Sequence, residues 1–210
     1  MYDFVVVGAG PPGSRFARRA AEAGRDVVAF EKGSVGEPLA CSGHVSDDVW
    51  EYVPDGARDE LLQNLVYGAR FHVDGPGSRA YPFYKREPVS NVIDRVGLDR
   101  TLADCARDTG ADVREDHTVV GVEERPDRVV VEVKTPAGDV ERVEARMVAG
   151  CDGPTSRVRR ALDLPEPDEL LHGVLGFDPE RDAGDYVDVH LTAPTFFAWR
   201  IPRGDAGVEY

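Results

Sequence analysis

Three glycines near the N-terminus have a spacing that can bind phosphate groups. Gly8, Gly10 and Gly13 form the pattern G-x-G-x-x-G directly after the apolar run at residues 4–7. In such a turn the first glycine makes the bend, the second lets the backbone approach a pyrophosphate, and the third lets helix and strand pack closely. Glu31 follows the next apolar run and can accept hydrogen bonds from ribose hydroxyls. The pattern therefore predicts a dinucleotide site.

The elements that must position these residues follow in the required order. Residues 4–7 predict a buried parallel strand, residues 16–21 carry apolar side chains at helical spacing, Gly24 ends that helix, and residues 27–30 predict a second strand. A glycine-rich turn in some other α/β protein is the alternative. The strand, helix, strand and acid in register favour the dinucleotide site, without separating FAD from NAD.

A second candidate for chemistry is Cys41, in the loop EPLACSGHV at residues 37–45. It could be a packing residue, half of a disulfide or a reactive thiol. The chain has three cysteines and no C-x-x-C, and its five histidines show no metal-ligand spacing, so we predict no disulfide framework and no metal site. Cys105 and Cys151 fall where small packing residues are expected. For Cys41, a role as a packing residue and a role as a reactive thiol both stay open.

The rest of the chain shows where further elements lie. The stretch after the cysteine loop is predicted to be irregular. Residues 98–106 predict a helix that ends near Gly110. Residues 117–153 predict a three-stranded antiparallel meander with turns at 126–127 and 136–139, and a further apolar strand that ends at Cys151-Asp152-Gly153. Gly204-Asp205-Ala206-Gly207 predicts a hairpin turn.

The charge of the chain limits its partners and its location. Among 210 residues, 39 acids face 25 bases, and the net charge is −14. A nucleic acid is not expected as a partner, because its phosphates need a basic surface. Only three bases are lysine, which favours a salt-rich cytoplasm over an ordinary acidic protein. No signal peptide or apolar span is visible, so we predict a cytoplasmic protein whose contact with a membrane is at most peripheral.

The strand order and the segment CDGPTSRVRR resemble the glutathione-reductase-type FAD fold, and within it the aromatic-hydroxylase branch. The loop around Cys41 is similar to the P-x-x-C-x-G loop of the geranylgeranyl reductase family, with Ser42 where a glycine is common. The segment PTFFAWRIP resembles the P-x-x-Y-x-W-x-F-P substrate motif of that family, starting at Pro194. Phe197 there replaces tyrosine and Ile201 replaces phenylalanine. The alternative for Phe196, Phe197 and Trp199 is a core strand.

The resemblance implies an α/β fold, with a Rossmann-like FAD-binding fold, an inserted antiparallel meander and the start of a mixed β-sheet substrate domain. Residues 1–165 would form the FAD-binding domain, with 45–90 contributing in part to the substrate side. Residues 166–210 would begin a substrate-binding domain that is truncated, because the family is longer. The implied FAD-binding residues are Gly8, Gly10, Pro12, Gly13, Glu31, Lys32, Cys41, Gly43, Arg95, Val120, Asp152 and Gly153. The implied substrate-binding residues are Phe197, Trp199, Ile201 and Pro202, and the implied catalytic residue is Cys41.

The implied function is an FAD-dependent reductase that saturates the double bonds of geranylgeranyl chains, on archaeal ether lipids or their precursors. Its partners would be an isoprenoid lipid and an electron donor, either NAD(P)H or ferredoxin. Two alternatives stay open. One is an FAD-dependent monooxygenase of the aromatic-hydroxylase type, and the other is a non-catalytic prenyl-binding protein on the same fold.

Overall fold

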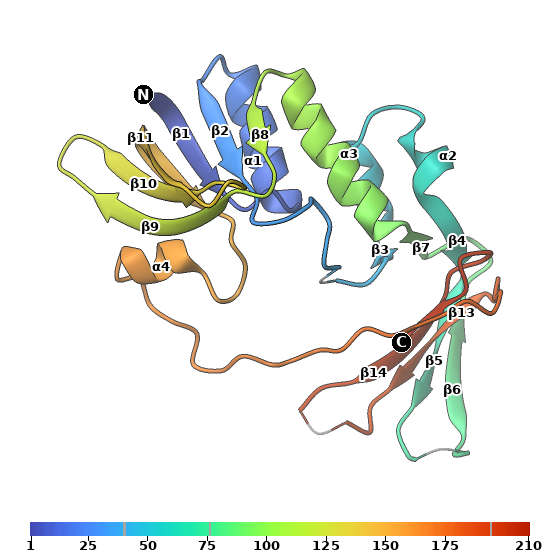
Figure 1. The fold of residues 1–210 in the computed structure, drawn as a ribbon. Helices are drawn as coiled ribbons and strands as arrows, with labels where there is room; N and C mark the ends of the chain where they lie inside the picture. Colours follow the sequence, from blue (N-terminus) through green and yellow to red (C-terminus); the bar gives the residue numbers. More distant parts are fainter. Residues whose placement is uncertain (40, 76, 194) are drawn as a thin grey trace. The chain divides into compact units, whose positions relative to one another are not determined.

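The computed structural model describes residues 1–39, 41–75, 77–193 and 195–210. They form two compact units (Figure 1). The first unit contains Met1–Leu39 and Asp99–Leu171, and the second contains Ala40–Leu98 and His172–Tyr210. The described residues between 41 and 98 therefore lie in the second unit, whereas the sequence predicted a partial contribution of residues 45–90 to the substrate side.

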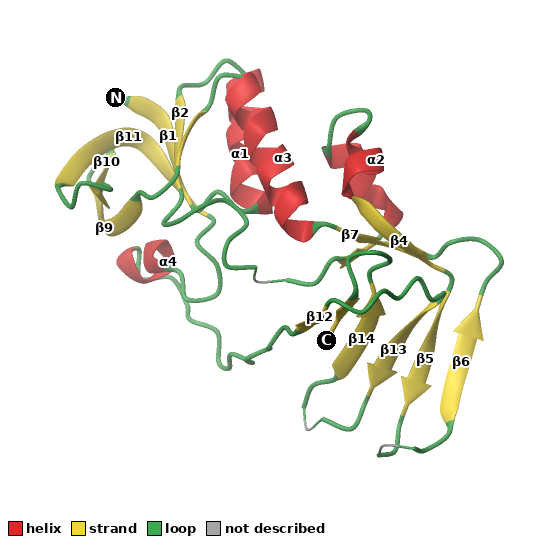
Figure 2. Cartoon of the chain, turned by 45° about the vertical axis from the view of Figure 1, so that its right-hand side comes forward, coloured by secondary structure: helices red, strands yellow, loops and turns green. Residues whose placement is uncertain are grey.

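A six-stranded sheet, in the order β8-β2-β1-β11-β10-β9, forms the centre of the first unit. Its parallel part contains β1 (Tyr2–Val7), β2 (Val27–Phe30) and β8 (Asp112–Arg114). The helices α1 (Pro11–Glu22) and α3 (Arg95–Asp108) lie side by side (Figure 2). Small side chains make this close packing possible, because Ala17 and Ala106 are buried against Val6, Val27 and Ala29. The predicted strand–helix–strand unit is confirmed.

The meander differs from the prediction in one strand. β9 (Thr118–Glu124) and β10 (Val129–Lys134) are followed by a single long strand, β11 (Val140–Gly150), where two strands were predicted. The first half of β11 pairs antiparallel with β10, and the second half pairs in parallel with β1. Apolar alternation continues through the change of partner, so the sequence alone does not show that one strand serves both neighbours. After the Asp152-Gly153 turn, the short helix α4 (Arg157–Ala161) contributes Val158 to the core below this part of the sheet.

The prediction of an irregular stretch after the cysteine loop is wrong. It contains β3 (His44–Val45), the 3₁₀ helix η1 (Asp47–Tyr52), α2 (Ala57–Leu61), β4 (Leu62–Val66), β5 (Gly68–His72), β6 (Ala80–Tyr84) and β7 (Ser90–Ile93). These elements are too short to show a clear period, and four of the five residues of β6 are exposed, so the apolar signal is weak. β3, β7 and β4 form a small antiparallel sheet.

A second six-stranded sheet, in the order β12-β15-β14-β13-β5-β6, forms most of the second unit. Its C-terminal strands are β12 (Phe177–Asp178), β13 (Tyr186–His190), β14 (Ala198–Pro202) and β15 (Val208–Glu209). β13 runs parallel to β5, while the other neighbours pair antiparallel, so the predicted mixed sheet is confirmed. Residues 203–207 form the predicted hairpin turn, with positive φ angles of 62° at Gly204 and 95° at Gly207.

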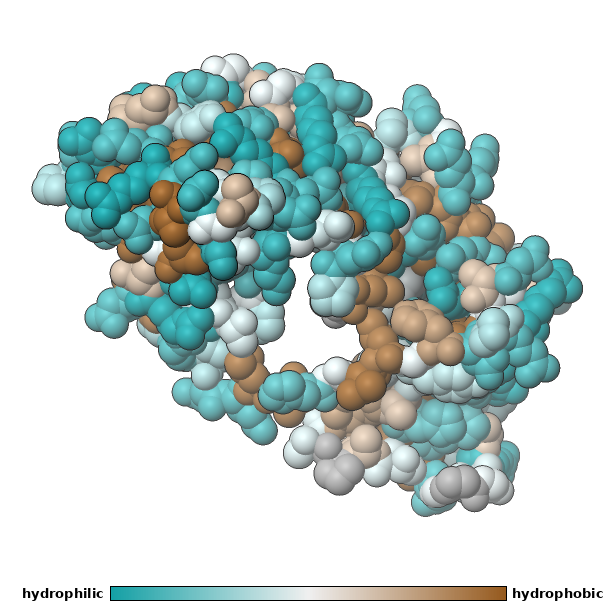
Figure 3. Space-filling model, viewed as in Figure 1, coloured by the Kyte–Doolittle hydropathy of each residue, from teal (hydrophilic) through white to brown (hydrophobic). Residues whose placement is uncertain are grey.

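The surface of the first unit is predominantly hydrophilic in the view of Figure 3. Among the described residues, no helix combines the length and the apolar character that crossing a membrane requires.

Candidate functional site

Two glycines of the N-terminal turn are required by packing. Gly8 has a φ of 93°, and a Cβ there would lie 2.4 Å from the carbonyl oxygen of Cys151. A Cβ on Gly13 would lie 1.9 Å from the carbonyl oxygen of Gly8. Both distances are shorter than any real contact, so these glycines let β1, α1 and the end of β11 meet closely.

Gly10 is different, because a Cβ there would meet no atom within 4 Å. It is the N-cap of α1, with an extended backbone (φ −64°, ψ −176°) that any residue can adopt. The space beside it is open at the positive end of a helix that carries no acid in its first turn and no side-chain cap. Pro11 and Pro12 lack N–H groups, so attraction for phosphate comes from the helix dipole and the neighbouring amides. A pyrophosphate fits this arrangement.

Glu31 lies at the end of β2, beside the same turn. Its Oε2 accepts a hydrogen bond from the Ala9 N–H at 2.8 Å, and its Oε1 accepts one from the Lys32 N–H at 3.0 Å. Ser14, which the sequence analysis missed, is fully buried and donates its hydroxyl to the Ala9 carbonyl at 2.7 Å. Glu31 and Ser14 thus hold the N–H and the carbonyl of Ala9 in the turn. The only sign of Ser14 in the sequence was its place directly after the third glycine.

The loop after Glu31 is tied to neighbouring elements of the first unit. The Val35 N–H donates to Glu115 on the segment after β8 at 2.6 Å, and Arg107 of α3 pairs with the same carboxylate at 3.1 Å. Arg100 of α3 pairs with Glu37 at 2.5 Å. The Arg100–Glu37 and Val35–Glu115 contacts join residues that are 63 and 80 positions apart in the chain. No local sequence pattern predicts contacts over such separations.

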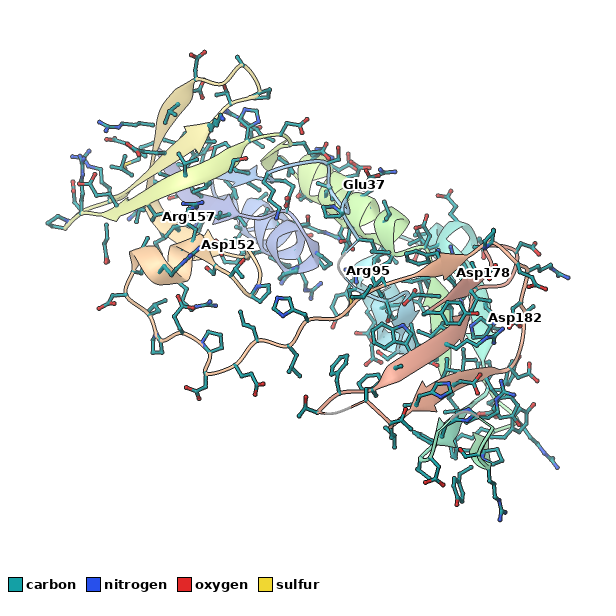
Figure 4. All side chains as sticks on the ribbon, turned by 60° about the horizontal axis from the view of Figure 1, so that its bottom comes forward. Glu37, Arg95, Asp152, Arg157, Asp178 and Asp182 are labelled. Atoms are coloured by element: carbon teal, nitrogen blue, oxygen red, sulfur yellow. The ribbon has the colours of Figure 1, made fainter. Side chains whose placement is uncertain are left out.

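The Asp-Gly motif caps a helix. Asp152 accepts hydrogen bonds from the Ser156 hydroxyl at 2.5 Å and from the Arg157 N–H at 2.6 Å. Ser156 in turn accepts from the Arg159 N–H at 2.9 Å. Asp152 therefore has a structural role at the start of α4, where Figure 4 labels it together with Arg157. Its predicted contact with a cofactor, like that of Gly153, stays a prediction.

Val120 lies at an irregularity of β9. The ladder with β10 pairs Gly121 with Glu132 and Val119 with Val133, so Val120 has no register partner. Its carbonyl accepts a hydrogen bond from the Arg157 side chain at 3.2 Å. A β-bulge frees main-chain groups from the ladder, which is what the predicted backbone contact with a cofactor requires. The sequence showed no sign of the bulge.

The cysteine loop and Arg95 belong to the second unit. Cys41 is exposed and a free thiol. Gly43 is required by packing, because a Cβ there would lie 2.4 Å from the Ile93 carbonyl oxygen. Arg95 is the first residue of α3 and is half-buried. The approach of these three residues to a cofactor stays a prediction.

The aromatic segment divides into an exposed part and a buried part. Phe196 and Phe197 are about 40% exposed and stack on one another at 4.8 Å between ring centroids, with Trp199 5.7 Å from Phe197. Ile201 is 3% exposed and packs in the core of the unit, and Pro202 is buried. Pro194, the first residue of the predicted motif, lies outside the described residues.

The other two cysteines are half-buried. Cys151 packs beside the core between β1, β2 and α1. Burial raises the pKa of its thiol, and the nearby charge of Asp152 raises it further. Burial also raises the pKa of the Cys105 thiol on α3, and the nearby charges of Arg18 and of the neighbouring acids modify that shift. A raised pKa reduces the thiolate fraction, so neither thiol is activated.

Residues 1–188 match the family model described as "FAD binding domain". The chain belongs to this FAD-binding domain family. Its cofactor is accordingly FAD, and the open space at Gly10, the crowded glycines around it and the carboxylate at the end of β2 are consistent with this cofactor.

The FAD-binding domain is similar to curated geranylgeranyl reductases, so the predicted resemblance is confirmed. It is 31% identical to digeranylgeranylglycerophospholipid reductase 2 of Methanopyrus kandleri over 231 residues, which cover 97% of this chain and 52% of the relative. The sequence of the Thermoplasma acidophilum reductase is 29% identical over 219 residues, covering 97% of this chain and 54% of that protein. The chain thus spans about half the length of the curated relatives it matches.

Solved structures agree on the fold. A geranylgeranyl bacteriochlorophyll reductase-like protein from Thermoplasma acidophilum superposes with a TM-score of 0.79 at 27% identity, covering 99% of this chain and 55% of that chain.

Proposed function

We propose that the protein carrying this FAD-binding domain is an FAD-dependent reductase that saturates isolated double bonds of geranylgeranyl chains, on archaeal ether lipids or their precursors. The names of the curated relatives support this substrate class. The observation that carries the proposal is an apolar, aromatic face on the sheet of the second unit, which includes Trp199 of the predicted substrate motif.

Strand register places four side chains of this face in one row. Tyr81 on β6 pairs with Phe71 on β5, Phe71 pairs with Val189 on β13, and Val189 pairs with Trp199 on β14. Directly paired residues point to the same side of a sheet, and neighbouring strands lie about 4.8 Å apart, so the row is roughly 14 Å long. We name these four residues the aromatic row.

The aromatic row is partly covered. Val189 and Trp199 pack against the core formed by Val66, Val92, Val187 and Ile201. Phe71 and Tyr81, at the other end, are 38% and 49% exposed. A hydrocarbon chain has no polar group to be recognised, so it is held by apolar burial and close packing alone. An uncovered aromatic surface continuous with Trp199 is suited to such a chain.

The proposed chemistry requires positioning more than acid–base catalysis. Bound FAD in its reduced form supplies a hydride to one alkene carbon, and a proton is added to the other. The alkene is not polarised, so the residues of this chain contribute by holding it in near-attack contact and by excluding water. The aromatic row and Phe197 would hold the chain, and Cys41 would shape the flavin environment or take part in proton delivery.

The test uses purified holoprotein with chemically reduced flavin and a geranylgeranyl glycerophospholipid in detergent. We expect mass spectrometry to show the gain of two hydrogen atoms for each saturated bond, with none when the flavin is left oxidised. Phe71→Ser should raise the KM for the lipid by roughly tenfold, because it removes part of the apolar contact surface. Oxygen-dependent consumption of NAD(P)H without saturation of the lipid would instead identify a monooxygenase.

A further inference from the structure

A carboxyl group is buried on the apolar face of the second sheet. Glu209 on β15 is 1% exposed, and its register partner on β14 is the core residue Ile201. Burying a carboxyl group is unfavourable unless its oxygens are hydrogen-bonded, and an apolar side chain at such a position packs without that cost. Because burial of this carboxyl group is unfavourable, the role of Glu209 must be sought in the hydrogen bonds that its two oxygens accept.

Both oxygens of Glu209 are used, and each reaches a different predicted site segment. Oε2 accepts a hydrogen bond from the Gly43 N–H at 3.1 Å, in the cysteine loop. Oε1 accepts one from the Trp199 indole N–H at 3.2 Å, in the substrate motif. All three residues lie within the second unit.

The hydrogen bonds to Glu209 restrict the backbone at Gly43 and the orientation of the Trp199 ring. The Gly43 carbonyl accepts from the Ile93 N–H at 2.9 Å, so the loop is fixed between β7 and Glu209 two residues after Cys41. The Trp199 ring contacts Phe197, and its hydrogen bond to Glu209 determines which edge of the indole faces inward.

We propose that Glu209 is a positioning residue, which locks the Cys41–Gly43 loop and the Trp199 indole into one arrangement. This role rests on the proposed function, in which the first segment faces the flavin and the second faces the isoprenoid chain. Because alkene and flavin must meet in near-attack geometry, a small shift of either segment lowers turnover more than it lowers binding.

The variant that tests this is Glu209→Gln in the holoprotein. The amide preserves volume but can accept only one of the two N–H groups, since its NH₂ then faces the other donor. We expect kcat with the geranylgeranyl lipid to fall roughly ten- to a hundredfold, with a smaller change in KM. Glu51→Gln, an exposed acid of the same unit, is the matched control and should behave like the unmodified protein.

A second measurement is independent of activity. The chain has two tryptophans, so in a Trp50→Phe background the fluorescence reports Trp199 alone. Glu209→Gln should shift the emission maximum of Trp199, and Glu51→Gln should leave it unchanged. In addition, Trp199→Phe removes the indole N–H but keeps a ring, so its effect on kcat and that of Glu209→Gln should be less than additive in the double variant.

The outcomes separate this proposal from the proposed function. If the unmodified holoprotein leaves the lipid unsaturated, the function is wrong, and the emission shift still decides whether Glu209 positions Trp199. Unchanged emission in Glu209→Gln overturns the positioning role. So does a normal kcat accompanied only by a lower melting temperature, which would show a purely structural role. If Glu209→Gln does not fold, Trp199→Phe decides the matter, and a kcat equal to that of the unmodified protein overturns the proposal.

Discussion

At the scale of single residues, glycines that share a motif have different physical roles. Gly8 and Gly13 leave no space for a side chain, because backbone oxygens lie where a Cβ would be. Gly10 leaves open space and has an ordinary backbone conformation. Mutations at these positions therefore separate folding from binding.

Gly10→Val should lose FAD and still fold. The valine side chain has room in the free protein but occupies the position that the pyrophosphate needs. We expect little or no bound flavin by absorbance after purification, with a far-ultraviolet circular dichroism spectrum like that of the unmodified apoprotein.

Gly13→Val is the matched comparison for this variant, and it should fail to fold because its Cβ would overlap the Gly8 carbonyl. Stoichiometric flavin in Gly10→Val would show that the pyrophosphate lies elsewhere.

Cys41→Ala should keep the fold and the flavin but lose most turnover. Cys41 is exposed, so its removal costs little packing, whereas the proposed function places it beside the flavin. Flavin content, melting temperature and saturation of the geranylgeranyl lipid measure the three properties separately. Full activity would make Cys41 a residue without a chemical role and would weaken the reductase assignment.

Gly43→Ala gives the contrasting result two residues away. Its Cβ would collide with the Ile93 carbonyl, so we expect lower stability as well as lower activity.

At the scale of elements, short helices and sheets depend on a few polar contacts. The five-residue helix α4 is capped by Ser156, and Asp152 holds the first turn. Ser156→Ala should lower the free energy of unfolding by about 1 kcal/mol, as the loss of an N-cap usually does. Urea denaturation measures this change. Thr155→Ala, one position earlier, is the control, and an equal loss in both variants would contradict the capping role.

The small sheet β3-β7-β4 contains a histidine that should make stability depend on pH. Burial lowers the pKa of His44 below its usual 6.5, and its Nε2 lies 2.6 Å from the Ser90 hydroxyl. The folded state therefore resists protonation of His44, while the unfolded chain takes up a proton below pH 6.5. We expect stability to be highest above that pH and to fall as the pH drops through it.

Thermal unfolding between about pH 5 and pH 8 measures this dependence, in the range where histidine titrates. His44→Gln should show a flatter profile than the unmodified protein over the same range. Parallel profiles would mean that other groups cause the pH dependence.

At the scale of the whole molecule, acids exceed bases by 14, which is the difference between 39 and 25. Some are paired on the exposed meander, such as Arg125 with Glu123 and Arg142 with Glu132. Exposed pairs of this kind add little to stability, because water and salt screen them. The surplus carboxylates repel one another over the surface.

The unfolding midpoint should therefore rise with salt. Between about 0.1 M and 1 M potassium chloride the Debye length falls from about 10 Å to about 3 Å, which screens most of the repulsion between separated charges. Calorimetry at both concentrations measures the shift. An unchanged midpoint would show that the acidic surface has no role in a salt-rich environment.

Local patterns in the sequence determined the glycine-rich turn after β1, the helix after it, the turns of the meander and the hairpin turn at residues 204–207. Each depends on residues close together in the chain: glycines at a bend, apolar side chains at a helical period, or a proline or glycine between alternating runs. The FAD fold and the candidate residues of the first unit followed from these patterns and from the resemblance that they support.

Only the tertiary structure decided how distant segments meet. It showed one strand, β11, pairing with both β10 and β1, and it placed the described residues between 41 and 98 in the second unit. It brought Glu209 to Gly43 across 166 positions and joined the same carboxyl group to Trp199. Such contacts depend on which surfaces remain to be buried once the local elements have formed, and no short-range periodicity records that choice.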